Sequence, residues 1–195
     1  MSKHEDILHS ILIVSGSEKY ASLIKDSLPA GRFLSIENKK NGTLARQCIL
    51  ERFYDMVVIN APLSDENGLE LAMDIAEEGS VGVMIMAPAE VHDDIQDYVA
   101  RFGIFTVPKP TDKKTLGRTL KLFVGVADRI SRMRMETEKL RDRIEANRII
   151  TKAKFILADE KNMSEDEAHR YIGKCAMDRG VSRRRIAEDI IEEFD

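Results

Sequence analysis

The sequence of 195 residues is poor in the residues from which most active sites are built. Its two cysteines, Cys48 and Cys175, are far apart and fit no metal-binding or redox spacing, so we expect both to be reduced. The four histidines form no cluster with catalytic spacing. Because no nucleophile–base pair, metal cluster or phosphate loop is recognisable, we expect a protein that is not an enzyme and that holds no cofactor.

Long apolar runs are also missing. No stretch approaches the roughly 18 consecutive apolar residues that a membrane span needs. The first ten residues include His4, Glu5 and Asp6, whereas a signal peptide has a basic start followed by an apolar core. We therefore expect no membrane contact and a cytoplasmic location. The net charge is −4, so any surface that binds nucleic acid must be a local basic patch.

Up to Pro110, short apolar runs alternate with amphipathic stretches. The runs are typical of buried strands, and the stretches between them are typical of helices. This alternation predicts an α/β fold, a flavodoxin-like doubly wound parallel sheet with helices on both faces, in a domain of residues 1–124. The expected strands are 11–15, 33–37, 56–60, 83–86 and 104–107, and the expected helices are 18–28, 43–53, 68–78 and 91–102.

Beyond Pro110 the pattern changes to a single long helix. From Val126 to Thr151 the seam positions recur at alternating intervals of four and three residues, which is the spacing of a heptad coiled coil, although Thr137, Asn147 and Thr151 among them are polar. We predict that residues 125–148 form a coiled-coil helix that mediates a homodimer, with the direction of pairing open. A solvated helix that packs on its own domain is the alternative. The predicted dimer seam consists of Val126, Ile130, Met133, Leu140 and Ile144.

The last segment, residues 149–195, is expected to form a small all-α domain of three helices. The long helix continues to about Ala158, and Ser164 with Glu167 forms a capping box that starts the next helix. Gly180 is typical of a helix end, and Ser182 can cap a third helix. The apolar residues that can share one core are Ala153, Ile156, Leu157, Ala168, Ile172, Cys175, Ile186, Ile190 and Phe194.

The first 110 residues resemble a response-regulator receiver domain through the segments ILIVSGSEKY, MVVINAPLSDENGLEL and GIFTVPKP. The resemblance implies a site where two acidic residues and an aspartate bind Mg²⁺ and the aspartate accepts a phosphoryl group. This sequence departs from that pattern at every position except the lysine that precedes a proline. The acidic pair falls on Ser15 and Gly16, the phosphoacceptor on Asn60, the hydroxyl position on Ala87, the switch aromatic on Thr106 and the retained lysine on Lys109.

These substitutions predict that the phosphorylation site is lost. Mg²⁺ prefers anionic oxygen ligands, and an asparagine amide is a poor nucleophile toward phosphorus. Asp65 and Glu66 follow the third strand, but they fall on a loop rather than at the strand's end, and whether either substitutes stays open. Lys109 is either a relic of phosphate binding or a lysine that holds the loop. Control would then come from a regulatory protein, a small ligand or the expression level.

Residues from about 153 to 191 resemble the ANTAR family of antiterminator domains. The resemblance is carried by AKFIL, SEDEAHRYIGKCAMD and RRRIAEDII, with Ala168, Ala176, Met177 and Ala187 at the positions that the family motif requires. It implies binding to hairpin RNA in a leader transcript, which prevents a terminator from forming.

Basic residues in this segment group locally. Three arginines crowd the first turn of the last helix, where the helix dipole favours acidic residues, so we expect RNA phosphate to offset their repulsion. A merely solvated basic face is the alternative. His169 and Tyr171 could stack on looped-out bases, although the spacing of Tyr171 favours core packing. The predicted RNA-binding residues are Lys154, Arg170, Lys174, Arg179, Arg183, Arg184 and Arg185.

The favoured function is therefore that of an RNA-binding regulator of transcription antitermination. A DNA-binding transcription factor is one alternative, because residues 180–190 loosely resemble part of a helix-turn-helix. A protein-interaction adaptor is another, and it predicts no salt-dependent binding to nucleic acid.

Overall fold

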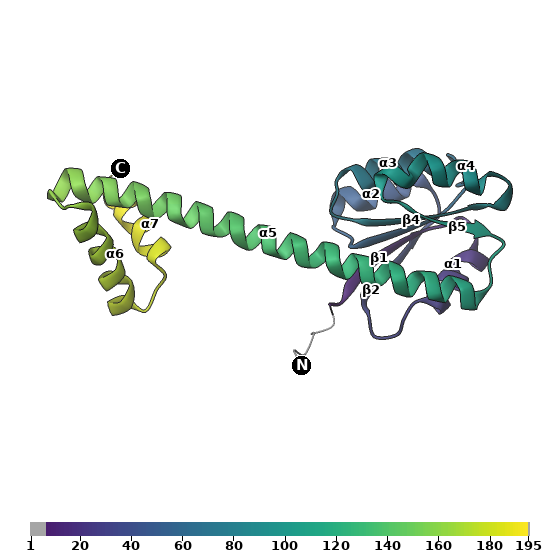
Figure 1. Cartoon of the computed structure of the whole chain (residues 1–195), viewed down its shortest axis with the longest axis horizontal. Coiled ribbons are helices and arrows are strands. Elements are labelled where there is room, and N and C mark those ends of the chain that lie inside the picture. Colours follow the sequence, from purple (N-terminus) through teal and green to yellow (C-terminus); the bar gives the residue numbers. More distant parts are fainter. Residues whose placement is uncertain (1–6, 195) are drawn as a thin grey trace. The chain divides into compact units, whose positions relative to one another are not determined.

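The computed structural model describes residues 7–194 (Figure 1). The chain divides into two compact units, Met1–Arg134 and Met135–Asp195, and one helix contributes to both. Within the described residues, no helix has the length and apolar character needed to cross a membrane.

The first unit contains a five-stranded parallel sheet with the strand order β2-β1-β3-β4-β5. This arrangement confirms the predicted α/β fold, and the bounds differ from the predicted ones by only a few residues. The strands are β1 (His9–Val14), β2 (Phe33–Lys39), β3 (Met56–Asn60), β4 (Gly82–Pro88) and β5 (Phe105–Lys109).

Helices cover both faces of the sheet, because successive residues of a strand point to opposite sides. Ile11 and Ile13 of β1 belong to a core shared with α1 and α5, whereas Leu12 and Val14 belong to a core shared with α2, α3 and α4. The helices are α1 (Glu18–Ser27), α2 (Gly42–Glu51), α3 (Leu69–Glu77), α4 (Ala89–Val99) with the short η1 (Ala100–Phe102), and α5 (Lys113–Lys161).

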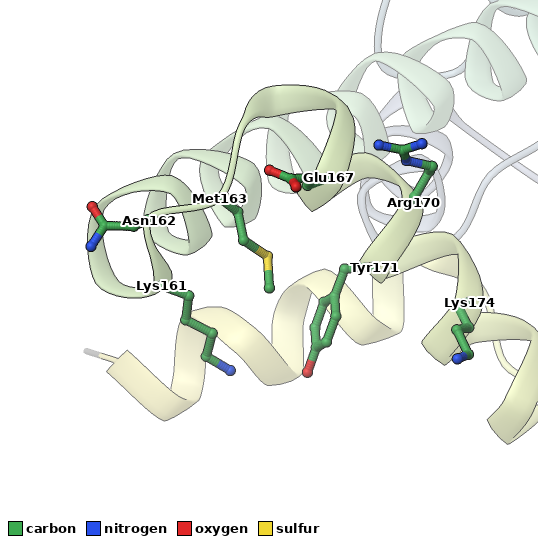
Figure 2. A pocket seen from close by; sticks show the side chains of 7 residues that line it. All are labelled: Lys161, Asn162, Met163, Glu167, Arg170, Tyr171 and Lys174. Carbon is green, nitrogen blue, oxygen red and sulfur yellow. The ribbon is translucent and has the colours of Figure 1, made fainter.

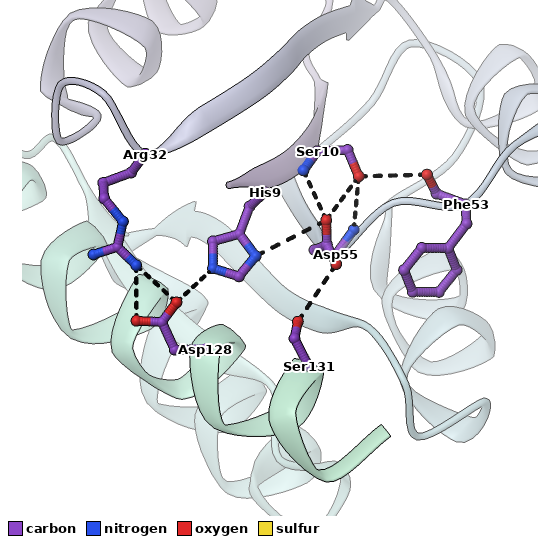
Figure 3. A network of polar contacts seen from close by, with 7 residues as sticks. All are labelled: His9, Ser10, Arg32, Phe53, Asp55, Asp128 and Ser131. Atoms are coloured by element: carbon purple, nitrogen blue, oxygen red, sulfur yellow. Dashed lines mark hydrogen bonds and ion pairs between the residues drawn. The ribbon is translucent and has the colours of Figure 1, made fainter. Parts of the chain in front are cut away.

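The first part of α5 packs on the sheet beyond the predicted domain boundary at residue 124. Ala127 is buried in the core, and the next residue, Asp128, is bonded to two residues of the sheet domain (Figure 3). His9 Nε2 lies 2.8 Å from Asp128 Oδ1, and Arg32 Nη2 donates to the same oxygen at 2.7 Å. These contacts explain why the compact unit extends into the stretch that was predicted to be coiled coil.

His9 is completely buried at the amino-terminal end of β1. Its second ring nitrogen, Nδ1, lies 3.9 Å from Asp55 Oδ2, so the ring stands between two carboxylates. Burial by itself lowers the pKa of His9, but Asp55 and Asp128 together raise it above the ordinary value. Burial raises the pKa of Asp55, but the nearby His9 ring and the hydrogen bonds from Ser10 outweigh it and lower that pKa to about 2.

The second unit contains the end of α5, α6 (Glu165–Arg179) and α7 (Arg183–Phe194). The helix α5 continues to Lys161, so the predicted interruption from residue 159 is wrong. It ends where Asn162 adopts a left-handed conformation with φ 50°. The capping box of Ser164 and Glu167 is present as predicted. The buried core consists of Ala153, Leu157, Ala168, Ile172, Ala176, Ile186, Ala187 and Ile190.

Both turns of this unit use the expected capping chemistry. Gly180 has φ 65°, a left-handed conformation that glycine adopts without strain, and the amide of Val181 reaches back to the carbonyl of Ala176 at 3.1 Å. Ser182 then accepts a hydrogen bond from the amide of Arg185 at 3.2 Å. The short turn therefore fixes where the three arginines of α7 begin.

Candidate nucleic-acid interface

At the carboxyl ends of the strands lies Asn60, the residue predicted to stand in place of a receiver's phosphoacceptor. Asn60 is buried, its Nδ2 donates to Ser15 Oγ at 3.0 Å, and its Oδ1 accepts from Lys109 Nζ at 2.7 Å. Lys109 also donates to the carbonyl of Ala61. Burial lowers the pKa of Lys109. The hydrogen-bonding capacity of Lys109 is thus directed to neutral oxygens of the protein itself.

The carboxylates of Asp65 and Glu66, on the loop after β3, both interact with residues of α2. Asp65 accepts hydrogen bonds at 2.9 Å from the amides of both Gly42 and Thr43, at the start of α2. These hydrogen bonds lower the pKa of Asp65 to about 2. Glu66 pairs with Arg46. In residues 7–194, no three acidic, histidine or cysteine side chains are grouped so that they could hold a metal ion.

Four of the seven predicted RNA-binding residues are held in ion pairs within the second unit. Glu165 pairs with Lys154 at 2.6 Å, and Asp189 pairs with both Arg179 and Arg185 at 3.1 Å. Arg184 pairs with Glu188 at 2.8 Å, and its pKa is raised by Glu188 and by two acidic residues of α5. Arg184 and Arg185 therefore have carboxylate partners within the domain, so their repulsion does not need RNA phosphate to offset it.

The other three predicted residues form no ion pair with any carboxylate in the part of the chain that the structure describes. Arg170 and Lys174 are one helical turn apart on the exposed side of α6. Met177 follows on the next turn and is 79% exposed. The guanidinium of Arg183 lies along the same helix, because a Cβ atom built on Gly173 would be 3.5 Å from Arg183 Nη2. We call Arg170, Lys174, Met177 and Arg183 the α6 crest.

One flank of the α6 crest opens into a hollow between the end of α5 and α6 (Figure 2). Tyr171 stands in this hollow and is 37% exposed, so it lies at the surface rather than in the core that its spacing favoured. His169 is exposed as well. No sequence signal located the hollow, because it is formed by residues on either side of a turn. The ion pairs of Arg184 and Arg185, in contrast, could have been found from their spacing of four residues to Glu188 and Asp189.

Comparisons with known proteins found similarities to both units of the chain. The ANTAR domain family matches residues 138–191. The transcriptional regulatory protein PdtaR of Mycobacterium tuberculosis, from two strains, is 23% identical over 138 residues, which cover 71% of this chain and 67% of PdtaR.

Among solved structures, the signal receiver domain of an HD domain-containing protein from Pseudomonas fluorescens Pf-5 is 18% identical, with a TM-score of 0.54 over 66% of this chain and 94% of that one. A two component transcriptional regulator AraC from Clostridium phytofermentans ISDg is 19% identical, with a TM-score of 0.56 over 62% and 96%. Identities this low show the fold alone. The chain therefore joins a domain with the receiver fold to an ANTAR domain at residues 138–191.

Proposed function

We propose that this protein regulates transcription antitermination by binding hairpin RNA in a leader transcript, in the cytoplasm, without aspartyl phosphorylation. The observation that carries the proposal is the α6 crest. In a domain where four predicted cations are neutralised by the protein's own carboxylates, Arg170, Lys174 and Arg183 remain exposed without an ion pair among the described residues. Three exposed cations close together attract an anionic ligand.

The chemistry of the α6 crest suits RNA phosphates. Guanidinium groups can bind phosphate oxygens in a bidentate manner, and Lys174 adds a mobile ammonium. Arg183 is the first residue of α7, where unpaired backbone amides and the helix dipole also favour an anion. The exposed thioether of Met177 offers an apolar contact between these cations.

Independence from phosphorylation is supported by the network around Asn60. Lys109, which would contact a phosphoryl group, instead donates to Asn60 and Ala61. Ser15 and Gly16 supply no carboxylate, and Asp65 caps α2. A protein or small ligand that binds the receiver-fold unit would then replace phosphorylation as the signal.

The proposal is tested by selecting a tight binder from two-hairpin RNAs with randomised loops and titrating it against the full-length protein. Simultaneous replacement of Arg170, Lys174 and Arg183 by alanine should weaken binding, because three phosphate contacts are lost. For single-stranded RNA the slope of log affinity against log salt should become shallower by about two units, at about 0.7 per contact. The control carries Arg184→Ala and Arg185→Ala, which remove two arginines that the protein already neutralises.

The control variant should keep most of the wild-type affinity and slope. Equal losses in both variants would show that the α6 crest has no special role. A wild-type protein that binds the corresponding DNA duplex as tightly as the RNA would support the DNA-binding alternative, and one that binds neither would refute the proposed function.

A further inference from the structure

The hollow beside the α6 crest has a volume of about 470 Å³, within the size range of small-ligand sites. It is open to solvent, and Figure 2 shows Lys161 and Met163 on one side and Tyr171 on the other directed toward it. Its lining residues are Lys161, Asn162 and Met163, from the end of α5 and the following turn, and Glu167, Arg170, Tyr171 and Lys174, from α6.

One wall of the hollow provides a surface on which a flat group can stack. The ring of Tyr171 is turned toward the opposite wall, where the thioether of Met163 lies (Figure 2). Lys161 Nζ is 5.4 Å from the centre of the Tyr171 ring and 5.5 Å from the centre of the Phe194 ring. Because Lys161 is exposed on a flexible stem, its ammonium can remain near Phe194 when another group covers Tyr171.

The hollow offers polar groups for the edge of a base as well as cations for phosphate. Glu167 lies within the lining, and its Oε2 accepts hydrogen bonds from the amide and the hydroxyl of Ser164 at 2.9 and 2.7 Å. These hydrogen bonds lower the pKa of Glu167, so the lining holds one carboxylate beside the three cations Lys161, Arg170 and Lys174. Glu167 Oε1 can accept a hydrogen bond from an amino group on the edge of a base.

The position of the hollow links it to the α6 crest. Arg170 and Lys174 belong both to the crest and to the lining. A nucleotide whose phosphates contact these two residues can therefore place its base in the hollow without leaving the crest. Single-stranded RNA is commonly recognised in this way, with unstacked bases on aromatic rings and phosphates on neighbouring cations.

We infer that the hollow receives one unpaired base from the loop of the bound hairpin, stacked on the ring of Tyr171, while Arg170 and Lys174 contact the adjoining phosphates. The inference rests on the proposed function and adds a site of base recognition to it. Phosphate contacts alone carry no sequence information, so this site would give the α6 crest a means of selecting among loops.

The test compares Tyr171→Leu with Tyr171→Phe, using the selected hairpin RNA and the full-length protein. Leucine keeps an apolar side chain but removes the stacking surface, whereas phenylalanine keeps the ring. We expect Tyr171→Leu to bind about five- to hundredfold more weakly and Tyr171→Phe to bind within about twofold of wild type. The salt slope should not change, because no phosphate contact is lost.

Abasic substitution of each loop nucleotide in turn provides a measurement that does not depend on the folding of a variant. Removing the base at one loop position should weaken binding to wild-type protein as much as Tyr171→Leu does. Combining that abasic RNA with Tyr171→Leu should lower the affinity no further than either change alone. The inference is overturned if wild-type protein binds the hairpin and Tyr171→Leu binds it equally well, or if no loop position behaves in this way. Failure of the wild-type protein to bind any hairpin would refute the proposed function itself.

Discussion

At the scale of single residues, His9 combines complete burial with two flanking carboxylates and the guanidinium of Arg32 on Asp128. Both carboxylates stabilise an imidazolium, although Asp128 also pairs with Arg32 at 2.7 Å and with Arg132 at 4.0 Å. The raised pKa of His9 agrees with the charged form. Because these contacts join β1, the residue that precedes β3, and α5, the ionisation of His9 bears on how firmly α5 is held to its own unit.

The first prediction concerns the pH dependence of stability. Since the pKa of His9 is raised above 6.5 in the folded protein, its contribution is complete below that value and is lost as the pH rises through the raised pKa. The free energy of unfolding of wild-type protein in urea should therefore decrease over that range. His9→Gln should remove most of this decrease, while His169→Gln, which changes an exposed histidine, should retain it. An unchanged decrease in His9→Gln would show that another group is responsible.

The second prediction concerns Asn60. Wild-type protein incubated with Mg²⁺ and acetyl phosphate should show no phosphoryl adduct by intact mass, because both the acceptor carboxylate and the acidic pair are missing. Asn60→Asp should also remain unmodified, since Ser15 and Gly16 still supply no anionic ligand. An authentic receiver domain serves as the positive control. A wild-type adduct that maps to the receiver-fold unit would contradict the loss of this site.

At the scale of helices and strands, local patterns in the sequence predicted most of what the structure contains. The capping box of Ser164 and Glu167 placed the start of α6 correctly, because its two hydrogen bonds involve residues three apart. Contacts between distant residues were not predictable in this way. His9 and Asp128 are separated by 119 positions, and Asp65 caps a helix that precedes it in the chain. Only the folded sheet brings these groups together.

In the candidate nucleic-acid interface, too, local features were predictable from the sequence and contacts between helices were not. The basic residues could be found from composition, but which of them remain without an ion pair depends on packing between helices. Asp189 of α7 reaches Arg179 at the end of α6, a contact that spacing along one helix does not reveal. The position of Arg183 against Gly173 is likewise a contact between two helices. Composition therefore predicted a basic surface but not the α6 crest.

The third prediction is that α5 mediates a homodimer through the seam. Met133, Leu140 and Ile144 are 59%, 52% and 68% exposed in the single chain, so each has apolar surface left for a partner helix. Leu140→Lys would bury an unpaired charge in the dimer, which would destabilise the dimer by several kcal/mol. In the monomer the lysine would be exposed to solvent and tolerated. Light scattering should change from dimer to monomer mass for Leu140→Lys and not for Lys139→Ala. A monomeric wild-type protein at tens of micromolar would contradict the prediction.

At the scale of the whole molecule, a single helix, α5, supplies core residues to both units. Leu116, Leu120 and Phe123 are buried in the receiver-fold unit, and Ala153 and Leu157 are buried in the ANTAR unit. The protein as a whole is acidic, with a net charge of −4, yet the α6 crest is locally cationic. Binding to nucleic acid is thus expected to depend on one small surface rather than on general attraction, and to be sensitive to salt.

The proposed function requires the unphosphorylated protein to prevent termination through the α6 crest. It is tested most directly by transcription in vitro from a template that carries the selected two-hairpin leader ahead of a terminator, without any phosphodonor. We predict that wild-type protein increases the fraction of full-length transcript, and that the variant lacking Arg170, Lys174 and Arg183 does not. An unchanged fraction of full-length transcript at protein concentrations that saturate the hairpins, or equal activity of the variant, would contradict this account.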